Sequence, residues 1–346
     1  MPLNSIPPTT TLENLKVKQN EARRVGVHCD VGFWGGIVPG NAAELVPMLE
    51  AGVKGFKCFL IDSGVEVRPE LLMLAHTDQV LGVLTCGGGR PDQGLRRFSS
   101  KSVVFVGTMT VTKLAQNTSA LILFHAELEG PDDIPSTNVD PSQYSAFLES
   151  RPSSMELSAL DLVLRLVRGY PRLRFHIVHL STAAALPAIR QARASGISNL
   201  TVETCFHYLC LRSEDIALNA TQYKCCPPIR DEANRKQLCA ALLDGTIDFV
   251  VSDHSPCLPE LKKGDFMSAW GGVSGLGLGL SLLWTELGAQ AGLGSIIRWL
   301  GCRPAGPVEL QGTKGVIAVG ADADFALFDP TAQLRVTEVG GFRTRW

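Results

Sequence analysis

The sequence lacks the patterns that mark secreted, membrane-spanning or zinc-finger proteins. Its ten cysteines include no Cys-x-x-Cys pair, so zinc-finger spacing is not indicated. Residues 1–8 have neither the basic start nor the apolar core of a secretory signal. The apolar run from Leu276 to Trp284 is far shorter than the ~20 residues of a membrane-spanning helix. These absences predict a cytoplasmic or organellar protein, with mitochondria and peroxisomes among the organelles, whose thiols are reduced.

An excess of charge of one sign is also missing. The chain has 32 Lys and Arg residues against 34 Asp and Glu residues, which gives a formal net charge of −2. Such a balance offers no basic surface to nucleic acid or to an anionic membrane, so we expect neither as a partner. With 45% hydrophobic and 19% charged residues over 346 positions, the composition is typical of one large globular domain, alone or with an accessory domain.

Short apolar runs alternate with helical patterns from position 41 onward. We expect strands at 55–60, 121–125, 173–179, 200–203 and 247–251. We expect helices at 41–51, 158–167, 183–194 and 231–243, the first opened by a capping box at Asn41 and Glu44. Repeated strand–helix units predict an α/β fold with a parallel sheet, either open and doubly wound or closed as a (β/α)₈ barrel. Residues 64–107 interrupt the alternation as a long loop or an insertion.

Four polar residues stand in or at the ends of the expected strands. Lys57 lies within an apolar strand, His125 and His179 end two others, and Asp253 follows a fourth. At the carboxyl ends of barrel strands such side chains converge on one mouth. Imidazoles and a carboxylate are good zinc ligands, and a buried lysine has a lowered pKa, so its free amine can capture CO₂ as a metal-bridging carbamate. An aspartate beside such a centre can carry a proton to a leaving nitrogen, so the set suits metal-assisted amide hydrolysis.

The same residues also have structural interpretations, which the residue pattern alone leaves open. A histidine at a strand end is often a satisfied core residue, a strand lysine often extends to the surface, and Asp253 has the position of a turn or helix cap. His176 stands three residues before His179, so we expect it to point away from the partners of His179 or to be partly buried. The neighbouring thiols of Cys225 and Cys226 are expected in the core.

Seven motifs then follow one another in order along the chain. They are Gly55-Phe-Lys-Cys-Phe59, Phe124-His-Ala-Glu127, His176-Ile-Val-His-Leu-Ser181, Glu203-Thr-Cys-Phe-His-Tyr208, Lys224-Cys-Cys-Pro-Pro-Ile-Arg230, Val251-Ser-Asp-His-Ser-Pro-Cys257 and Ala269-Trp-Gly-Gly-Val-Ser-Gly-Leu276. The series resembles the allantoinases, cyclic amidohydrolases of the dihydroorotase and hydantoinase group. Gly315 to Asp324 resembles the turn by which such enzymes return to a small β-sandwich. The resemblance covers most of 1–63 and 108–330.

The resemblance implies a zinc-dependent hydrolase of purine catabolism that opens the hydantoin ring of allantoin to allantoate. The fold would be a (β/α)₈ TIM-type barrel over 1–303 with an accessory β-sandwich segment over 304–346. Lys57 would be the carboxylated lysine that bridges two zinc ions, His125 and His179 ligands of one zinc, and Asp253 a ligand of the other and the catalytic proton shuttle. The assembly would be a homotetramer. The implied substrate-binding residues are Cys226, Pro227, Ser255, Trp270, Gly271 and Gly272.

The sequence departs from the family at two places. Cys226 stands where related hydantoinases tend to have serine. None of the seven histidines forms the His-x-His pair that the family's first strand supplies to the second zinc. Residues 1–8 instead resemble the end of the second strand, so we expect the barrel to lack its first strand and most of its second, and the accessory sheet to be cut short. This polypeptide is therefore expected to bind at most one zinc tightly and to have little or no activity.

Two other functions stay open at this point. The first is a catalytically silent scaffold or regulatory subunit, although a scaffold has no need of Lys57, His125, His179 and Asp253. Dihydropyrimidinase or dihydroorotase chemistry is the alternative within the enzyme class, and the Ala269-Trp-Gly-Gly272 motif argues against it.

Overall fold

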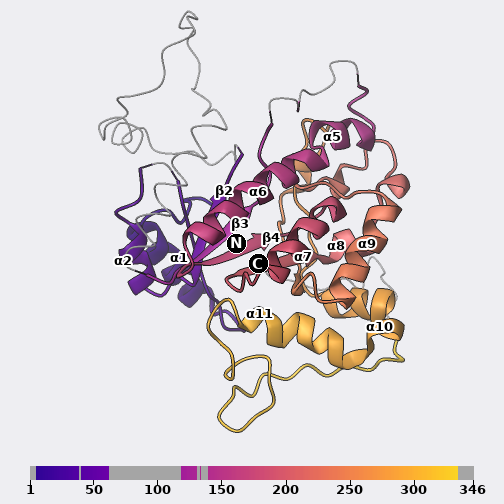
Figure 1. Cartoon of the computed structure of the whole chain (residues 1–346). Coiled ribbons are helices and arrows are strands. Elements are labelled where there is room, and N and C mark those ends of the chain that lie inside the picture. Colours follow the sequence, from indigo (N-terminus) through magenta and orange to yellow (C-terminus); the bar gives the residue numbers. More distant parts are fainter. Residues whose placement is uncertain (1–4, 39, 62–117, 131–132, 134–138, 334–346) are drawn as a thin grey trace, which may run out of the picture.

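The computed structural model describes residues 5–38, 40–61, 118–130, 133 and 139–333. The expected loop or insertion at 64–107 lies outside these residues. Six parallel strands form one sheet in which each strand pairs with the next along the chain (Figure 1). They are β1 (Trp34–Gly36), β2 (Gly55–Phe59), β3 (Leu121–His125), β4 (Arg174–Val178), β5 (Leu200–Cys205) and β6 (Phe249–Val251). The predicted α/β fold with a parallel sheet is confirmed.

Helices connect the strands and cover the sheet. They are α1 (Leu12–Val25), α2 (Leu45–Glu50), α5 (Tyr144–Ser150), α6 (Ser153–Gly169), α7 (Leu186–Ala194), α8 (Phe206–Cys210), α9 (Glu232–Leu243), α10 (Gly279–Ile297) and α11 (Arg303–Ala305). In Figure 1, α1 and α2 lie at the left, near the first strands of the sheet, and α8, α9 and α10 lie at the right. No helix in the described ranges is both long and apolar enough to cross a membrane.

The strand register aligns the carboxyl ends of neighbouring strands. Phe59, the last residue of β2, pairs with His125, the last residue of β3, and His125 pairs with Val178 at the end of β4. Parallel strands in this register present the residues that follow them at one common edge. The side chains that sequence analysis placed at strand ends therefore start from neighbouring positions.

The two faces of the sheet differ in what they bury. One face packs Phe56, Phe124 and Phe175 into the large core under the helices. The other face carries a small cluster of Leu121, Leu123 and Val178, and it also carries charged and imidazole side chains because alternate residues of a strand point to opposite faces.

The predicted capping box at Asn41 and Glu44 is wrong. Helix α2 begins only at Leu45, and the Asn41 amide instead donates to the carbonyls of Thr10 and Gly36, at 2.9 and 2.8 Å. The Glu44 carboxylate accepts from the Leu12 N–H at 2.9 Å, at the start of α1. Each side chain has a partner more than 30 residues away, Thr10 for Asn41 and Leu12 for Glu44, which a local pattern does not reveal.

The predicted accessory segment 304–346 is described as far as residue 333. Within this part, Gln311 and Lys314 form an isolated β-bridge, and the Trp284 indole of α10 donates to the Pro330 carbonyl at 3.1 Å. Its assignment to a β domain stays a prediction.

Candidate metal centre and substrate site

Three of the four predicted metal ligands meet in the interior. The Nε2 atom of His179, the residue after β4, lies 3.1 Å from Nδ1 of His125 and 3.4 Å from Nζ of Lys57. All three side chains are buried, because β2, β3 and β4 end side by side. The interpretation of Lys57 as a surface lysine is therefore wrong, and neither histidine is an isolated core residue.

The hydrogen bonds around the histidines determine which ring nitrogens are available. The Nε2 atom of His125 lies 2.7 Å from the Glu127 carboxylate, so this nitrogen carries the proton and Nδ1 keeps its lone pair. Nδ1 of His179 is buried and has no hydrogen-bond partner among the described residues. Burial lowers the pKa of His125 despite the opposing effect of Glu127, and burial together with the charge of Lys57 lowers the pKa of His179. Both rings are therefore neutral, the form that binds metal.

Lys57 has the character of a buried, reactive amine. Burial lowers its pKa to about 8, against the opposing attraction of Asp253 and Glu203. Its Nζ atom also lies 5.3 Å from the centre of the Phe59 ring. With this pKa about a tenth of the amine is uncharged at pH 7, far more than for an ordinary lysine, and the uncharged form is the one that reacts with CO₂.

Asp253 lies two residues after β6, the strand at the opposite end of the sheet from β1. It interacts electrostatically with Lys57, while burial raises the pKa of its carboxyl group. Asp253 and His179 both adopt a left-handed backbone, with φ values of 41° and 44°. Non-glycine residues in this region are strained, and such strain is concentrated at functional sites.

The donor set at this site fits a zinc ion. Two neutral imidazole nitrogens face each other with an amine beside them. In addition, Nδ1 of His179 is a buried polar atom without a hydrogen-bond partner among the described residues. In the described residues another group, Asp30, Asp322 and Asp324, also has metal-ligand spacing, but it is exposed. The Lys314 ammonium forms ion pairs with all three carboxylates and so already lies where a cation would bind.

Sequence reasoning gave no role to Glu127 and Arg151, which support the cluster. The fully buried Glu127 carboxylate joins His125 to the Arg151 guanidinium, which lies 2.5 Å away. Burial alone would raise the pKa of Glu127, but the hydrogen bond from His125 and the nearby positive charges lower it. The position of Glu127 two residues after His125, on the same face of an extended chain, is the signal that was available.

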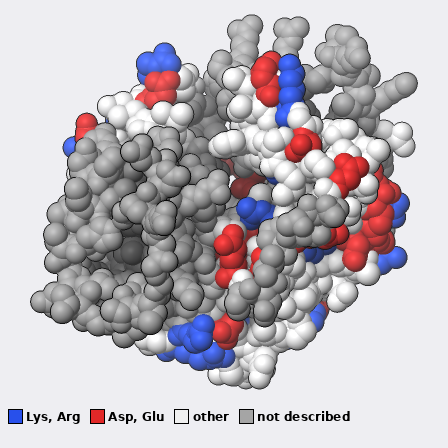
Figure 2. Space-filling view, turned by 90° about the horizontal axis from the view of Figure 1, so that it is seen from above, with Lys and Arg blue, Asp and Glu red and all other residues white. Residues whose placement is uncertain are grey.

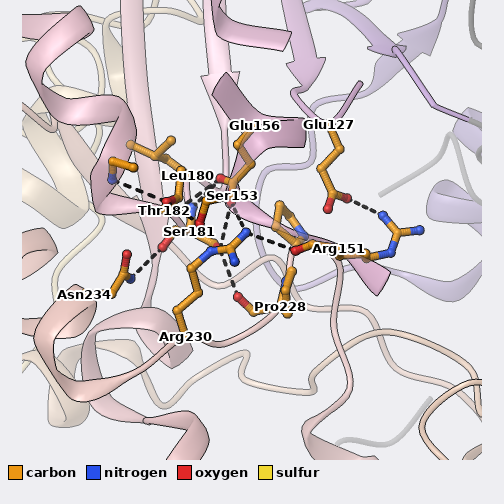
Figure 3. A network of polar contacts seen from close by, with 12 residues as sticks. Glu127, Arg151, Ser153, Glu156, Leu180, Ser181, Thr182, Pro228, Arg230 and Asn234 are labelled. Atoms are coloured by element: carbon orange, nitrogen blue, oxygen red, sulfur yellow. Dashed lines mark hydrogen bonds and ion pairs between the residues drawn. The ribbon is translucent and has the colours of Figure 1, made fainter. Parts of the chain in front are cut away.

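A second ion pair fixes the chain segments around the site (Figure 3). The Glu156 carboxylate of α6 accepts from the N–H groups of Ser181 and Thr182 and from the Arg230 guanidinium, at 2.9, 3.2 and 2.8 Å. The Ser181 hydroxyl in turn donates to the Pro228 carbonyl at 2.8 Å. The network therefore joins the chain just after His179 to the segment that contains Cys226 and Pro227.

The predicted substrate-binding residues lie in three segments that meet. A Cβ atom added to Gly271 would lie 3.5 Å from Sγ of Cys226, and one added to Gly272 would lie 2.7 Å from the Ser255 carbonyl. Trp270 is 52% exposed. The Pro227 carbonyl is already used, because it accepts from the Tyr208 hydroxyl at 2.6 Å. Seen from above, the molecule is hollowed near its centre, with acidic and basic side chains around the hollow (Figure 2).

Two further expectations have clear outcomes. His176 is buried on the same face of the sheet as Lys57 and His125, with its Nε2 atom 2.9 Å from Glu203 and its Nδ1 atom 2.7 Å from Thr201. Cys225 belongs to the core and Cys226 packs partly against it. Of the two alternatives expected for His176 the structure shows burial, and the predicted core position of the two thiols is confirmed.

Comparison with known proteins finds many similar chains. No family model matches. The chain is 43% identical to an allantoinase of Saccharomyces cerevisiae over 97% of its length and 66% of the relative. It is 46% identical to a protein of Aquarana catesbeiana named "Allantoinase, mitochondrial", over 83% of this chain and 52% of the relative. An allantoinase of Streptomyces avermitilis is 42% identical over 95% of this chain and 66% of the relative.

Solved structures give a consistent result. The fold matches the L-hydantoinase (dihydropyrimidinase) of Arthrobacter aurescens with a TM-score of 0.74 at 25% identity, over 94% of this chain and 66% of that one. A D-hydantoinase from Bacillus sp. AR9 matches with a TM-score of 0.69 at 25% identity, over 91% of this chain and 64% of that one. The chain thus spans between about half and two thirds of the length of these proteins.

Proposed function

This chain belongs to the allantoinase family of cyclic amidohydrolases, and from that premise we propose that its site is built to hydrolyse the hydantoin ring of allantoin to allantoate, a step of purine catabolism. The observation that carries the proposal is the meeting of Lys57, His125 and His179 at 3.1 and 3.4 Å, in a chain 43% identical to an allantoinase over 97% of its length. A scaffold would not need to bury these groups together, because their desolvation is unfavourable without a ligand.

The strand order supports a fold of the (β/α)₈ barrel type over residues 1–303. Each strand pairs with the next without any reversal of order. Right-handed crossovers in such a sheet all pass on the same side, so the helices cover one face and the other face turns inward. The inward face carries Lys57 and His176, which suits a barrel interior. Residues 304–346 would then form the partial accessory β segment.

We assign the metal-binding atoms from the available lone pairs. Nδ1 of His125 and Nε2 of His179 would hold one zinc ion together with the carboxylated Lys57, and Asp253 would be a ligand at the second metal position. The free amine of Lys57 would attack the carbon of CO₂, forming an N–C bond and releasing one proton, and the resulting carboxylate would be a further metal ligand. A zinc ion held by these residues would supply a Lewis acid for the scissile amide carbonyl. Because the sequence has no His-x-His pair, we propose at most one tightly bound zinc per chain.

Asp253 is the proposed proton shuttle. Burial raises the pKa of its carboxyl group, so it can take a proton from the attacking water and deliver it to the ring nitrogen as the C–N bond breaks. The backbone around Cys226 and Gly271 would hold the imide of the ring, since amide groups fixed on neighbouring segments match its donors and acceptors.

The substrate proposal is tested with the full chain, zinc and three cyclic amides: allantoin, dihydrouracil and dihydroorotate. Calorimetry should show binding of allantoin in preference to the other two, and any ring opening should yield allantoate and be lost in Asp253→Asn. Preference for a dihydropyrimidine ring, or no binding of allantoin at millimolar concentration, contradicts the proposal. Metal analysis of the same samples should give no more than one zinc per chain, and two zincs with rapid turnover would overturn that number.

We also propose a homotetramer in the cytoplasm or an organelle. The named mitochondrial location of the relative from Aquarana catesbeiana supports an organelle. Light scattering of the purified chain and imaging of a tagged chain in cells test these two points.

A further inference from the structure

We propose that Lys224 and Lys262 are positioning residues that fix the loop of Trp270, Gly271 and Gly272 against the segment of Cys226, and thereby shape the pocket for a cyclic amide. This inference rests on the proposed function for the identity of the ligand. Its structural part, the fixing of the loop by two ammonium groups, stands on contacts that do not involve the predicted metal ligands.

Lys224 binds the loop through both its side chain and its backbone. Its Nζ atom is buried and donates to the carbonyls of Met267 and Ala269, at 3.0 and 2.6 Å. Its own carbonyl accepts from the Gly272 N–H at 2.8 Å. The ammonium also lies 5.4 Å from the centre of the Phe147 ring. Lys224 therefore holds the loop on both sides of Trp270.

Lys262 holds the same loop from its other end. Its Nζ atom donates to the Gly272 carbonyl at 2.7 Å, and it lies 3.2 and 3.4 Å from the carbonyls of Lys224 and Thr221. The peptide groups on both sides of Gly272 are therefore occupied, the N–H by Lys224 and the carbonyl by Lys262. The two lysines form one unit, since Lys262 also binds the Lys224 backbone.

The backbone of the loop has little conformational freedom at Gly272. Gly272 has a φ of 136°, and a side chain there would meet the Ser255 carbonyl at 2.7 Å. The lysine pair thus joins the loop of Gly271 to the segment of Cys226, and the Ser255 N–H, which donates to the Val273 carbonyl at 3.1 Å, brings the third segment against the same loop.

The chemistry of the pair favours a role in positioning. In the described part of the chain neither ammonium forms an ion pair with a carboxylate, and burial lowers the pKa of both lysines. An ammonium that is partly desolvated and has only carbonyl partners costs more desolvation free energy than an apolar contact between the same two loops would. It is suited to a loop whose backbone must hold one geometry, because an ammonium has three donors and binds several carbonyls at once.

The test compares Lys224→Met and Lys262→Met with Lys263→Met, a matched control in which an exposed lysine of the same segment is removed. The readout is acrylamide quenching of Trp270 fluorescence, taken as the difference between each protein and its Trp270→Phe counterpart. We expect the quenching constant of Trp270 to rise at least about twofold in the two test variants and to stay unchanged in Lys263→Met. Lys→Arg variants, which keep the charge and donors, should restore most of the protection.

Ligand and metal measurements separate positioning from unfolding. We expect allantoin to bind about tenfold more weakly to Lys224→Met and Lys262→Met, with zinc content equal to that of the wild type. Wild-type quenching in both Met variants overturns the inference. If the wild-type chain binds no allantoin, the proposed function fails, while the quenching experiment still decides whether the lysine pair fixes the loop.

A measurement on the wild-type chain covers the case in which the Met variants do not fold. The backbone N–H of Trp270 donates to the Leu261 carbonyl, and the backbone N–H of Gly272 donates to the Lys224 carbonyl, both at 2.8 Å. Hydrogen–deuterium exchange should find both amides protected and exchanging together. Rapid exchange of either amide at pH 7 contradicts a fixed loop.

Discussion

Nδ1 of His125 and Nε2 of His179 face each other at 3.1 Å, inside the protein and at the ends of neighbouring strands. Nε2 of His125 is bound to Glu127, so the two atoms that face each other are both lone-pair nitrogens if His179 carries its proton on Nδ1. Two such lone pairs repel unless a cation or a proton lies between them. The two nitrogens are therefore placed to share a proton or to bind a cation, and the second arrangement is the one that the proposed metal centre uses.

The first prediction concerns the pH dependence of stability. The pKa of Lys57 falls from its ordinary 10.5 to about 8 in the folded chain. Between pH 8 and 10.5 the unfolded chain therefore binds more protons, and the free energy of unfolding should rise with pH through this window. Lys57→Met removes this contribution. Urea denaturation of metal-free protein should show the variant gaining stability relative to wild type below pH 8, with the gain shrinking toward pH 10.5; parallel profiles would contradict it.

Glu127→Gln should weaken metal binding. The variant loses the carboxylate that fixes the His125 ring and holds the proton on Nε2, and such supporting contacts contribute about 10–100-fold in metal affinity. Competition with a chelator measures the change in zinc affinity. Glu129→Gln, which alters an exposed carboxylate two residues further on, is the control and should behave as wild type. Equal zinc affinities for the two variants would exclude a supporting role for Glu127.

Glu156→Gln should be strongly destabilising. Glu156 is 2% exposed and its partner Arg230 10%, so the substitution leaves a buried guanidinium without its charge partner. Such a change costs about 3–5 kcal/mol. Asp161→Asn on the same helix breaks an exposed ion pair with Arg165 and should cost under about 1 kcal/mol. Urea denaturation of the two variants gives the comparison, and a similar loss in both would refute the assigned importance of the buried network.

Gly272→Ala and Gly271→Ala should differ sharply although the residues are adjacent. At Gly272 the backbone has a φ of 136° and the added Cβ atom meets Ser255 at 2.7 Å, whereas at Gly271 it meets only Cys226 at 3.5 Å. We expect Gly272→Ala to cost about 1–3 kcal/mol and Gly271→Ala under about 0.5 kcal/mol. Thermal unfolding measures both, and equal melting temperatures would show that the loop adapts.

Much of the sheet was predictable because buried strands are continuous apolar runs. The run 121–125 matches β3 at both ends, and the helix expected at 231–243 is α9, capped by the Asp231 carboxylate. Helix α1 was missed because Leu15 is its only buried residue and leaves no apolar stripe. The expected strand at 247–251 is shorter in the structure, where β6 begins at Phe249.

The sequence by itself determined five of the six strands, β2 to β6, and their order along the chain, since apolar runs and the polar residues after them are local properties; it did not indicate β1, a three-residue strand with two glycines. It also supplied Lys57, His125, His179 and Asp253 as candidates. Only the tertiary structure decided that three of these side chains touch, that Glu127 and Arg151 support them, and that Lys224 and Lys262 hold the Gly272 loop. The partners of Lys224 are carbonyls 43 and 45 residues away. Every residue has a backbone carbonyl, so no side-chain pattern identifies which of them a buried ammonium will bind.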